Sequence, residues 1–152
     1  MQRFKFLAMR RHPKLTPVSR QHRKMLMLAQ LLKKNAPAYQ GLPQTPEGKI
    51  EYAIGLFVNL IEDHVEMEEN YIFPMAEKMS EQLEFLANQL KEEHKVLKER
   101  FMSLNPLVPD LELMNELGNL LEKHIRKEER EFFQQLQKEG KADLEALSLP
   151  IE

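Results

Sequence analysis

The chain has 152 residues, of which 42% are apolar, so it is long enough for one domain with a single core. A formal net charge of −2 gives no electrostatic basis for binding nucleic acid, and no apolar run approaches the length of a membrane-spanning helix. The absence of cysteine excludes disulfides, thiolate metal sites and a cysteine nucleophile, and we expect a cytoplasmic protein with no membrane partner.

Four amphipathic stretches follow one another along the chain, separated by segments rich in proline and glycine. The first begins near Ser19 as an N-cap, and the second begins at Thr45 with Pro46 in the first helical position. The third begins near Ser80 and the fourth near Asp110. Apolar residues recur at three- and four-residue spacing in each stretch. We therefore predict an all-α fold, an up-down antiparallel four-helix bundle.

The chain divides into three segments on this interpretation. Residues 1–18 form an N-terminal arm, residues 19–139 form the bundle, and residues 140–152 form a C-terminal tail with room for a short helix. Pro74 is expected to kink or end the second helix, and Gly140 to cap the fourth. We expect the basic residues of the arm to be solvated: Arg3, Lys5, Arg10, Arg11 and Lys14.

The second and fourth stretches resemble each other, which indicates an internal repeat. One reads EDHVEMEENYIF from Glu62 and the other reads EKHIRKEEREFF from Glu122. The first and third stretches are also alike, with QHRKML around His22 and EHKVL around His94. Such a repeat predicts an approximate two-fold axis through the bundle, with matched side chains contributed by both halves.

Polar residues with metal-ligating side chains interrupt the apolar stripes of all four helices. Residues four apart on a helix point nearly the same way, so each His-x-x-x-Glu pair faces inward together. One such histidine is more often a core residue, and one such pair is more often on the surface, but four signals in register favour a shared site. The candidate ligands are His22, His64, Glu68, His94, His124 and Glu128.

A metal would remove the cost of burying two carboxylates among four imidazoles in an apolar core. Each metal would take two histidines, both glutamates would bridge, and an oxygen from solvent would complete a site with open positions. Mixed nitrogen and oxygen ligation suits iron or manganese, and zinc is an alternative. Three neighbours remain open: Glu69 and Glu129 are hydrogen-bond partners or, more often, solvated, and Tyr71 is a boundary residue or a donor to a bound ligand.

The sequence resembles the hemerythrin-like family of HHE cation-binding domains over about residues 11–138. The resemblance rests on RRHPKLTPVSRQH, HVEMEENYIFP, EEHKVLKERF and LEKHIRKEEREFF. It implies a hemerythrin-like four-helix bundle with a carboxylate-bridged di-iron centre, holding two iron ions with an oxo or hydroxo bridge. By motif, the six residues listed above match the family's ligand positions.

The ligand pattern differs from that of the oxygen-carrying hemerythrins. Those proteins have His-x-x-x-His in the third helix, whereas Lys98 stands four residues after His94 here. They also have His-x-x-x-x-Asp in the fourth helix, whereas Glu128 follows His124 by four residues. Four histidines with two glutamates are more similar to the di-iron domain of the Repair of Iron Centers proteins, which also carry a cysteine-bearing domain that this chain lacks.

Four functions remain open at this point. The first is a non-haem di-iron protein that binds a small oxidant (O₂, NO or peroxide) at an open centre, for sensing, binding or detoxification. The second is a di-iron oxidoreductase that reduces NO or peroxide or assists iron-centre repair. The third is iron storage or delivery, and the fourth is a metal-free interaction bundle. The sequence leaves the oligomeric state undetermined.

Overall fold

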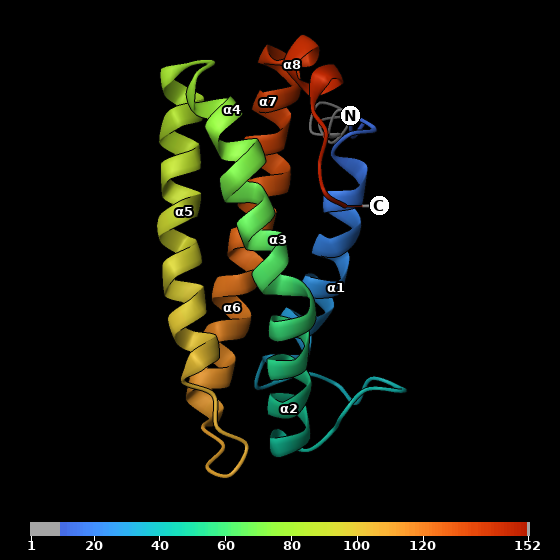
Figure 1. The fold of residues 1–152 in the computed structure, drawn as a ribbon. Coiled ribbons are helices and arrows are strands. Elements are labelled where there is room, and N and C mark those ends of the chain that lie inside the picture. The colour runs from blue at the N-terminus through green and yellow to red at the C-terminus, as the bar shows by residue number, and fades with distance from the viewer. Residues whose placement is uncertain (1–9, 152) are drawn as a thin grey trace, which may run out of the picture.

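A computed structural model of the protein describes residues 10–151, which fold into four long helical runs and one short helix (Figure 1). The first run is α1 (Thr16–Leu32) and the third is α5 (Glu81–Met102). The second run is continuous through α2 (Pro46–Leu56), η2 (Phe57–Ile61), α3 (Glu62–Met67), η3 (Glu68–Ile72) and α4 (Phe73–Glu77). The fourth run joins α6 (Leu111–Lys127), η4 (Glu128–Phe132) and α7 (Phe133–Glu139), and α8 (Lys141–Ala146) follows it.

The four runs lie side by side along a common axis (Figure 1). Helix α1 packs against α2 and α6, and α5 packs against α4 and α6, so neighbours in sequence are neighbours in space. Residues 10–151 contain no strand, which confirms the predicted all-α bundle. Within the same residues, no helix combines the length and the apolar character needed to span a membrane. The cytoplasmic location stays a prediction.

Side-chain caps begin three of the four runs as predicted. The hydroxyls of Thr45 and Ser80 accept hydrogen bonds from backbone N–H groups three residues ahead, and the carboxylate of Asp110 accepts two. The prediction for Ser19 was wrong, because α1 begins one turn earlier, with Leu15 in the N-cap position and no side-chain cap. The hydroxyl of Ser19 donates instead to the carboxylate of Glu129.

Three short segments of the second and fourth runs have the wider turn of a π-helix: η2, η3 and η4. The backbone N–H of Phe73 donates to the carbonyl of Glu68, and that of Phe133 donates to Glu128, each five residues back. Both wide turns begin at a candidate ligand, and single π turns often occur at functional sites. Pro74 is the second residue after η3, and the helix continues past it to Glu77.

Buried apolar side chains form two separate clusters, one toward each end of the bundle. The first includes Met25 and Leu97, and the second includes Val18 and Leu90. His22 lies between Val18 and Met25 in sequence, and His94 lies between Leu90 and Leu97. The candidate ligands therefore form a polar layer that divides the apolar core into two parts.

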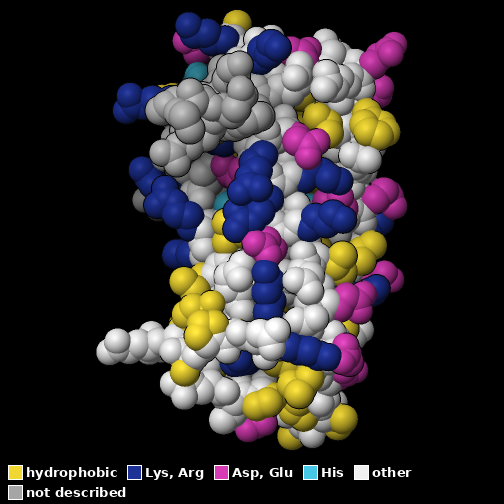
Figure 2. Space-filling view, turned by 180° about the vertical axis from the view of Figure 1, so that it is seen from behind, with side chains coloured by type: hydrophobic (Ala, Val, Ile, Leu, Met, Phe, Trp, Pro, Cys, Tyr) yellow, Lys and Arg dark blue, Asp and Glu magenta, His cyan; other side chains and the backbone are white. Residues whose placement is uncertain are grey.

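The surface carries mixed charge, and Lys and Arg side chains gather along the middle of the face opposite to that of Figure 1 (Figure 2). The prediction of a solvated arm was wrong for Arg11, which is half-buried and bonds to Gln137 and Glu129. Arg3 and Lys5 lie outside the described residues. At the other end of the chain, Gly140 ends α7 and begins α8, so the tail does carry a short helix.

Candidate metal centre

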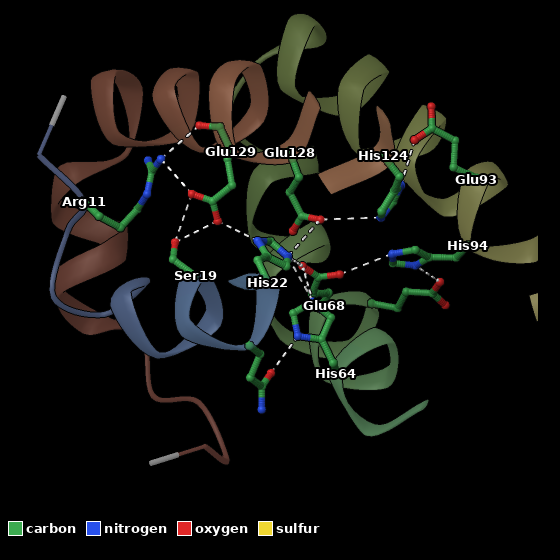
Figure 3. Close-up of polar contacts among 12 residues, drawn as sticks. Arg11, Ser19, His22, His64, Glu68, Glu93, His94, His124, Glu128 and Glu129 are labelled. Carbon is green, nitrogen blue, oxygen red and sulfur yellow. Dashed lines mark hydrogen bonds and ion pairs between the residues drawn. The ribbon is translucent and has the colours of Figure 1, made fainter. Parts of the chain in front are cut away.

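The structure brings all six candidate ligands together in the middle of the bundle (Figure 3). His22 comes from α1, His64 from α3, His94 from α5 and His124 from α6, while Glu68 and Glu128 begin η3 and η4. All six are buried, with 0% of each glutamate exposed and at most 5% of any of the histidines. The four long helical runs thus each contribute at least one side chain to the same layer.

Both glutamates lie between the two pairs of histidines. One carboxylate oxygen of Glu68 is 3.2 Å from Nε2 of His64, and the other is 3.2 Å from Nε2 of His94. Oxygen Oε1 of Glu128 is 3.6 Å from Nε2 of both His22 and His124. Glu68 also lies 3.6 Å from Nε2 of His22, so each carboxylate contacts at least one histidine of each half.

The buried atoms that face the centre of the layer lack hydrogen-bond partners. Both carboxylate oxygens of Glu68, both of Glu128, and Nε2 of His94 are buried without one among the described residues. Burying such atoms unpaired costs free energy, so the native structure needs something to satisfy them. Ligand atoms of Glu68, His94, His124 and Glu128 lie within 4.8 Å of one another, as do those of His22, His64 and Glu68. The donor set and its geometry fit metal ions.

Each histidine is held by a hydrogen bond at its outer ring nitrogen, Nδ1. His22 contacts Glu129 at 2.5 Å, His64 contacts Gln21 at 2.6 Å, and His94 and His124 contact Glu69 and Glu93 at 2.7 Å. Metal-ligating histidines usually bond a carboxylate or carbonyl in this way, which fixes the ring and its tautomer. The four Nε2 atoms are thereby directed into the layer.

The three outer glutamates are carboxylates rather than carboxylic acids. Burial raises the pKa of Glu93, but hydrogen bonds from His124 and Lys127 outweigh it and lower that pKa to about 2. A hydrogen bond from His94 lowers the pKa of Glu69. Burial also raises the pKa of Glu129, and hydrogen bonds from His22 and Ser19 lower it by more. Since ionised carboxylates only accept, the Nδ1 atoms facing them carry the protons.

Charged or hydroxyl side chains fix two of these outer carboxylates in turn. Arg11 donates to Glu129 at 2.9 Å and Ser19 donates to it at 2.7 Å (Figure 3). Lys127 donates to Glu93 at 2.5 Å. The N-terminal segment before α1 is thus connected to His22 through one carboxylate, which the sequence did not suggest.

When no metal is bound, protons on some of the six residues supply positive charge to the layer. Burial lowers the pKa of His22 and His94, but the nearby glutamates outweigh it, raising that of His22 well above its usual value and that of His94 to about 9. Burial lowers the pKa of His64 and His124. Burial and the charge of Glu68 raise the pKa of Glu128. Protons occupy the layer where metal would otherwise supply positive charge.

The sequence interpretation missed part of this arrangement. Of the two alternatives for Glu69 and Glu129, the hydrogen-bond partner is the one observed, since these half-buried side chains bond His94 and His22. Gln21 and Glu93 were not singled out, although the repeat places each directly before a stripe histidine. Tyr71 is 44% exposed, so it is a surface residue in this structure.

Four histidines and two glutamates are buried in one layer of this helical bundle. These features place the chain in the class of helical bundles with a metal-binding kind of site. The family model described as the hemerythrin HHE cation binding domain matches residues 15–136, which is most of the chain. The chain therefore belongs to the hemerythrin HHE family, as its sequence resemblance predicted. No curated protein and no solved structure matches it significantly. The closer likeness to Repair of Iron Centers proteins stays a prediction.

Proposed function

We propose that this chain is a non-haem di-iron protein whose buried layer binds two iron ions and, through them, a small oxidant such as O₂, NO or peroxide. His22 and His64 would hold one ion, His94 and His124 would hold the other, and both glutamates would bridge. The observation that carries this proposal is the set of five buried, unpaired ligand atoms on Glu68, Glu128 and His94.

The protein's own contribution is positioning and exclusion of water. The outer hydrogen bonds orient the four imidazole rings before any ion binds, which reduces the reorganisation needed for binding. Apolar clusters above and below the layer keep its dielectric low. Bound iron would supply the redox and Lewis-acid chemistry.

Iron loading under anaerobic conditions tests this proposal directly. We expect two iron ions per chain by elemental analysis, and a change in the visible spectrum when the reduced protein meets O₂ or NO. Recovery of the starting spectrum on removing the gas supports binding, whereas sustained consumption of NO or peroxide supports an oxidoreductase at the same centre. Fewer than one ion per chain after loading contradicts a di-iron site.

A double variant provides the matched control. His64→Ala with His124→Ala removes one histidine from each position, so we expect loss of both ions and of the metal-dependent rise in thermal midpoint. His12→Ala removes a histidine outside the layer and is expected to change neither. Equal metal content in the double variant and the wild type contradicts the assignment of these ligands.

A further inference from the structure

A cavity of about 360 Å³ enters the bundle on the side of α3 and α5 and reaches the polar layer. Its inner wall is apolar and comes from all four long helical runs. The apolar side chains that line it include Met25, Phe57, Ile61, Leu97, Phe101 and Leu121. These residues belong to the apolar cluster on one side of the layer.

The cavity reaches only one of the two proposed metal positions. Of the six candidate ligands, His94 and His124 line it, whereas His22, Glu68 and Glu128 do not. His64 borders a different pocket, shared with Gln21, which bonds its outer nitrogen. A molecule in the cavity would therefore lie beside the His94–His124 position.

The volume is larger than a diatomic ligand requires. A water molecule occupies about 30 Å³ of liquid, and an apolar cavity of about 150 Å³ already accepts benzene. Pockets for organic ligands usually begin at about 300 Å³. The size of this cavity, about 360 Å³, corresponds to an organic molecule of at least one ring.

The lining indicates the chemistry of such a molecule. Phe57 and Phe101 stack with ring centroids 4.7 Å apart, and they present aromatic surface to the cavity. The lining carries both signs of charge, with Lys95 and Lys98 on α5 and Glu62, Glu66 and Glu69 on the second helical run. Mixed charge favours neither an anion nor a cation, while the apolar wall favours a ring with a neutral polar group toward solvent.

We propose that this cavity binds a neutral aromatic molecule of about one ring and holds it against the His94–His124 position. Its role as a substrate or effector of the metal centre rests on the proposed function, but binding itself needs no metal. The proposal thus adds an organic ligand to the small oxidant expected at the centre.

Fluorine NMR with 4-fluorophenol as the probe tests this binding on the metal-free protein. Leu97→Phe fills the cavity from α5, and Leu86→Phe is its matched control, since both leucines are 7% exposed on the same helix and only Leu97 lines the cavity. We expect saturable binding to the wild type, at least about tenfold weaker binding to Leu97→Phe, and a change below about twofold in Leu86→Phe. Val65→Phe narrows the cavity from α3 and serves if Leu97→Phe does not fold.

A second measurement tests where the probe lies. The protein is loaded either with paramagnetic Co²⁺ or with diamagnetic Zn²⁺. We expect the fluorine signal of the bound probe to be strongly broadened in the Co²⁺ protein only. No saturable binding to the wild type, or equal binding to the filled variants, overturns the proposal. Binding without broadening in protein that holds two Co²⁺ ions overturns the placement beside the metal. If the probe binds normally but the protein takes up fewer than one metal ion per chain, the proposed function is contradicted and the proposed cavity ligand is not.

Discussion

Nε2 of His22 lies 3.1 Å from Nε2 of His64 in the interior of the bundle, although α1 and α3 are far apart in sequence. The pKa of His22 is raised and that of His64 is lowered, so a proton on His22 bridges the two rings when no metal is bound. Metal ligation needs the same two atoms, and metal and protons therefore compete for them.

Metal binding is expected to release protons near neutral pH. The pKa of His94 is raised to about 9, and the pKa of His22 and of Glu128 is also raised, so all three must lose a proton to become ligands. Apparent metal affinity should rise with pH up to about 9. Calorimetric titration in buffers of different ionisation enthalpy measures the protons released, and heats that are independent of the buffer would contradict this expectation.

The metal-free protein should also lose stability over the same pH range. The pKa of His94 is about 9 in the folded protein and 6.5 in the unfolded chain. The protonated ring therefore adds to the free energy of unfolding below pH 6.5, and this contribution is lost as the pH rises toward 9. Urea unfolding between these pH values should show a falling free energy of unfolding. The metal-loaded protein is the control, because its histidines cannot take up the proton, and the same decline there would refute the explanation.

Removing the carboxylate of Glu129 should weaken metal binding without touching a ligand. Glu129 holds Nδ1 of His22, and loss of such partners typically lowers metal affinity about 10- to 100-fold. Glu131→Ala is a matched control, since Glu131 is exposed on the same wide turn. Competition with a chelator measures both affinities. Equal affinities for Glu129→Ala and Glu131→Ala would show that the ring needs no such support.

The two metal positions should differ in affinity because their outer partners differ. Gln21, a neutral amide, bonds His64, whereas the carboxylate of Glu93 bonds His124 at the repeat-related place. A carboxylate makes its imidazole more basic, so the His94–His124 position should fill first. Nitrogen NMR of the imidazoles during Zn²⁺ addition shows the order, and Glu93→Gln should reduce the difference. If the signals of all four imidazole rings change together during the titration, the predicted difference in affinity is contradicted.

Two glycines should respond oppositely to alanine. A Cβ at Gly118 of α6 would lie 2.6 Å from the carbonyl oxygen of Ala29, so Gly118→Ala should push α1 from α6 and destabilise the fold by about 1–3 kcal/mol. At Gly55 a Cβ meets nothing within 4 Å, and alanine should stabilise this helix by about 0.5–1 kcal/mol. Urea unfolding measures both, and equal effects would contradict the close helix contact.

The helical stripes made the fold and the meeting of the six residues predictable. Their spacing fixes which residues face inward, and the repeat matches His22 with His94 and His64 with His124. Caps such as Thr45 were predictable because the hydrogen bond is local. The prediction of Ser19 as an N-cap was wrong because its hydrogen-bond partner, Glu129, lies on another helix. A local sequence pattern does not identify such a partner.

The outer hydrogen bonds were harder to predict because they join different helices. Ordinary α-helical geometry turns Glu69 and Glu129 about 100° from the inward residues. The backbone at Glu68 and Glu128 is α-helical, so this offset holds, and the partners of Glu69 and Glu129 are His94 and His22 on other helices, which no local pattern identifies. The sequence nonetheless contained a signal for these bonds. A side chain with a carboxylate or an amide stands next to His22 and His94, and another carboxylate stands next to each of the two proposed bridging glutamates.

The polar layer also determines how motion at one end of the molecule reaches the other. Because the two apolar clusters are separate, the ends of the bundle are joined by the helix backbones and by the six side chains between them. Ions in the layer would cross-link all four long helices at mid-height. Metal occupancy of the layer would then set how much of the protein unfolds cooperatively. With metal bound, the whole bundle would unfold as one unit, and with only protons in the layer, its two ends would unfold more independently.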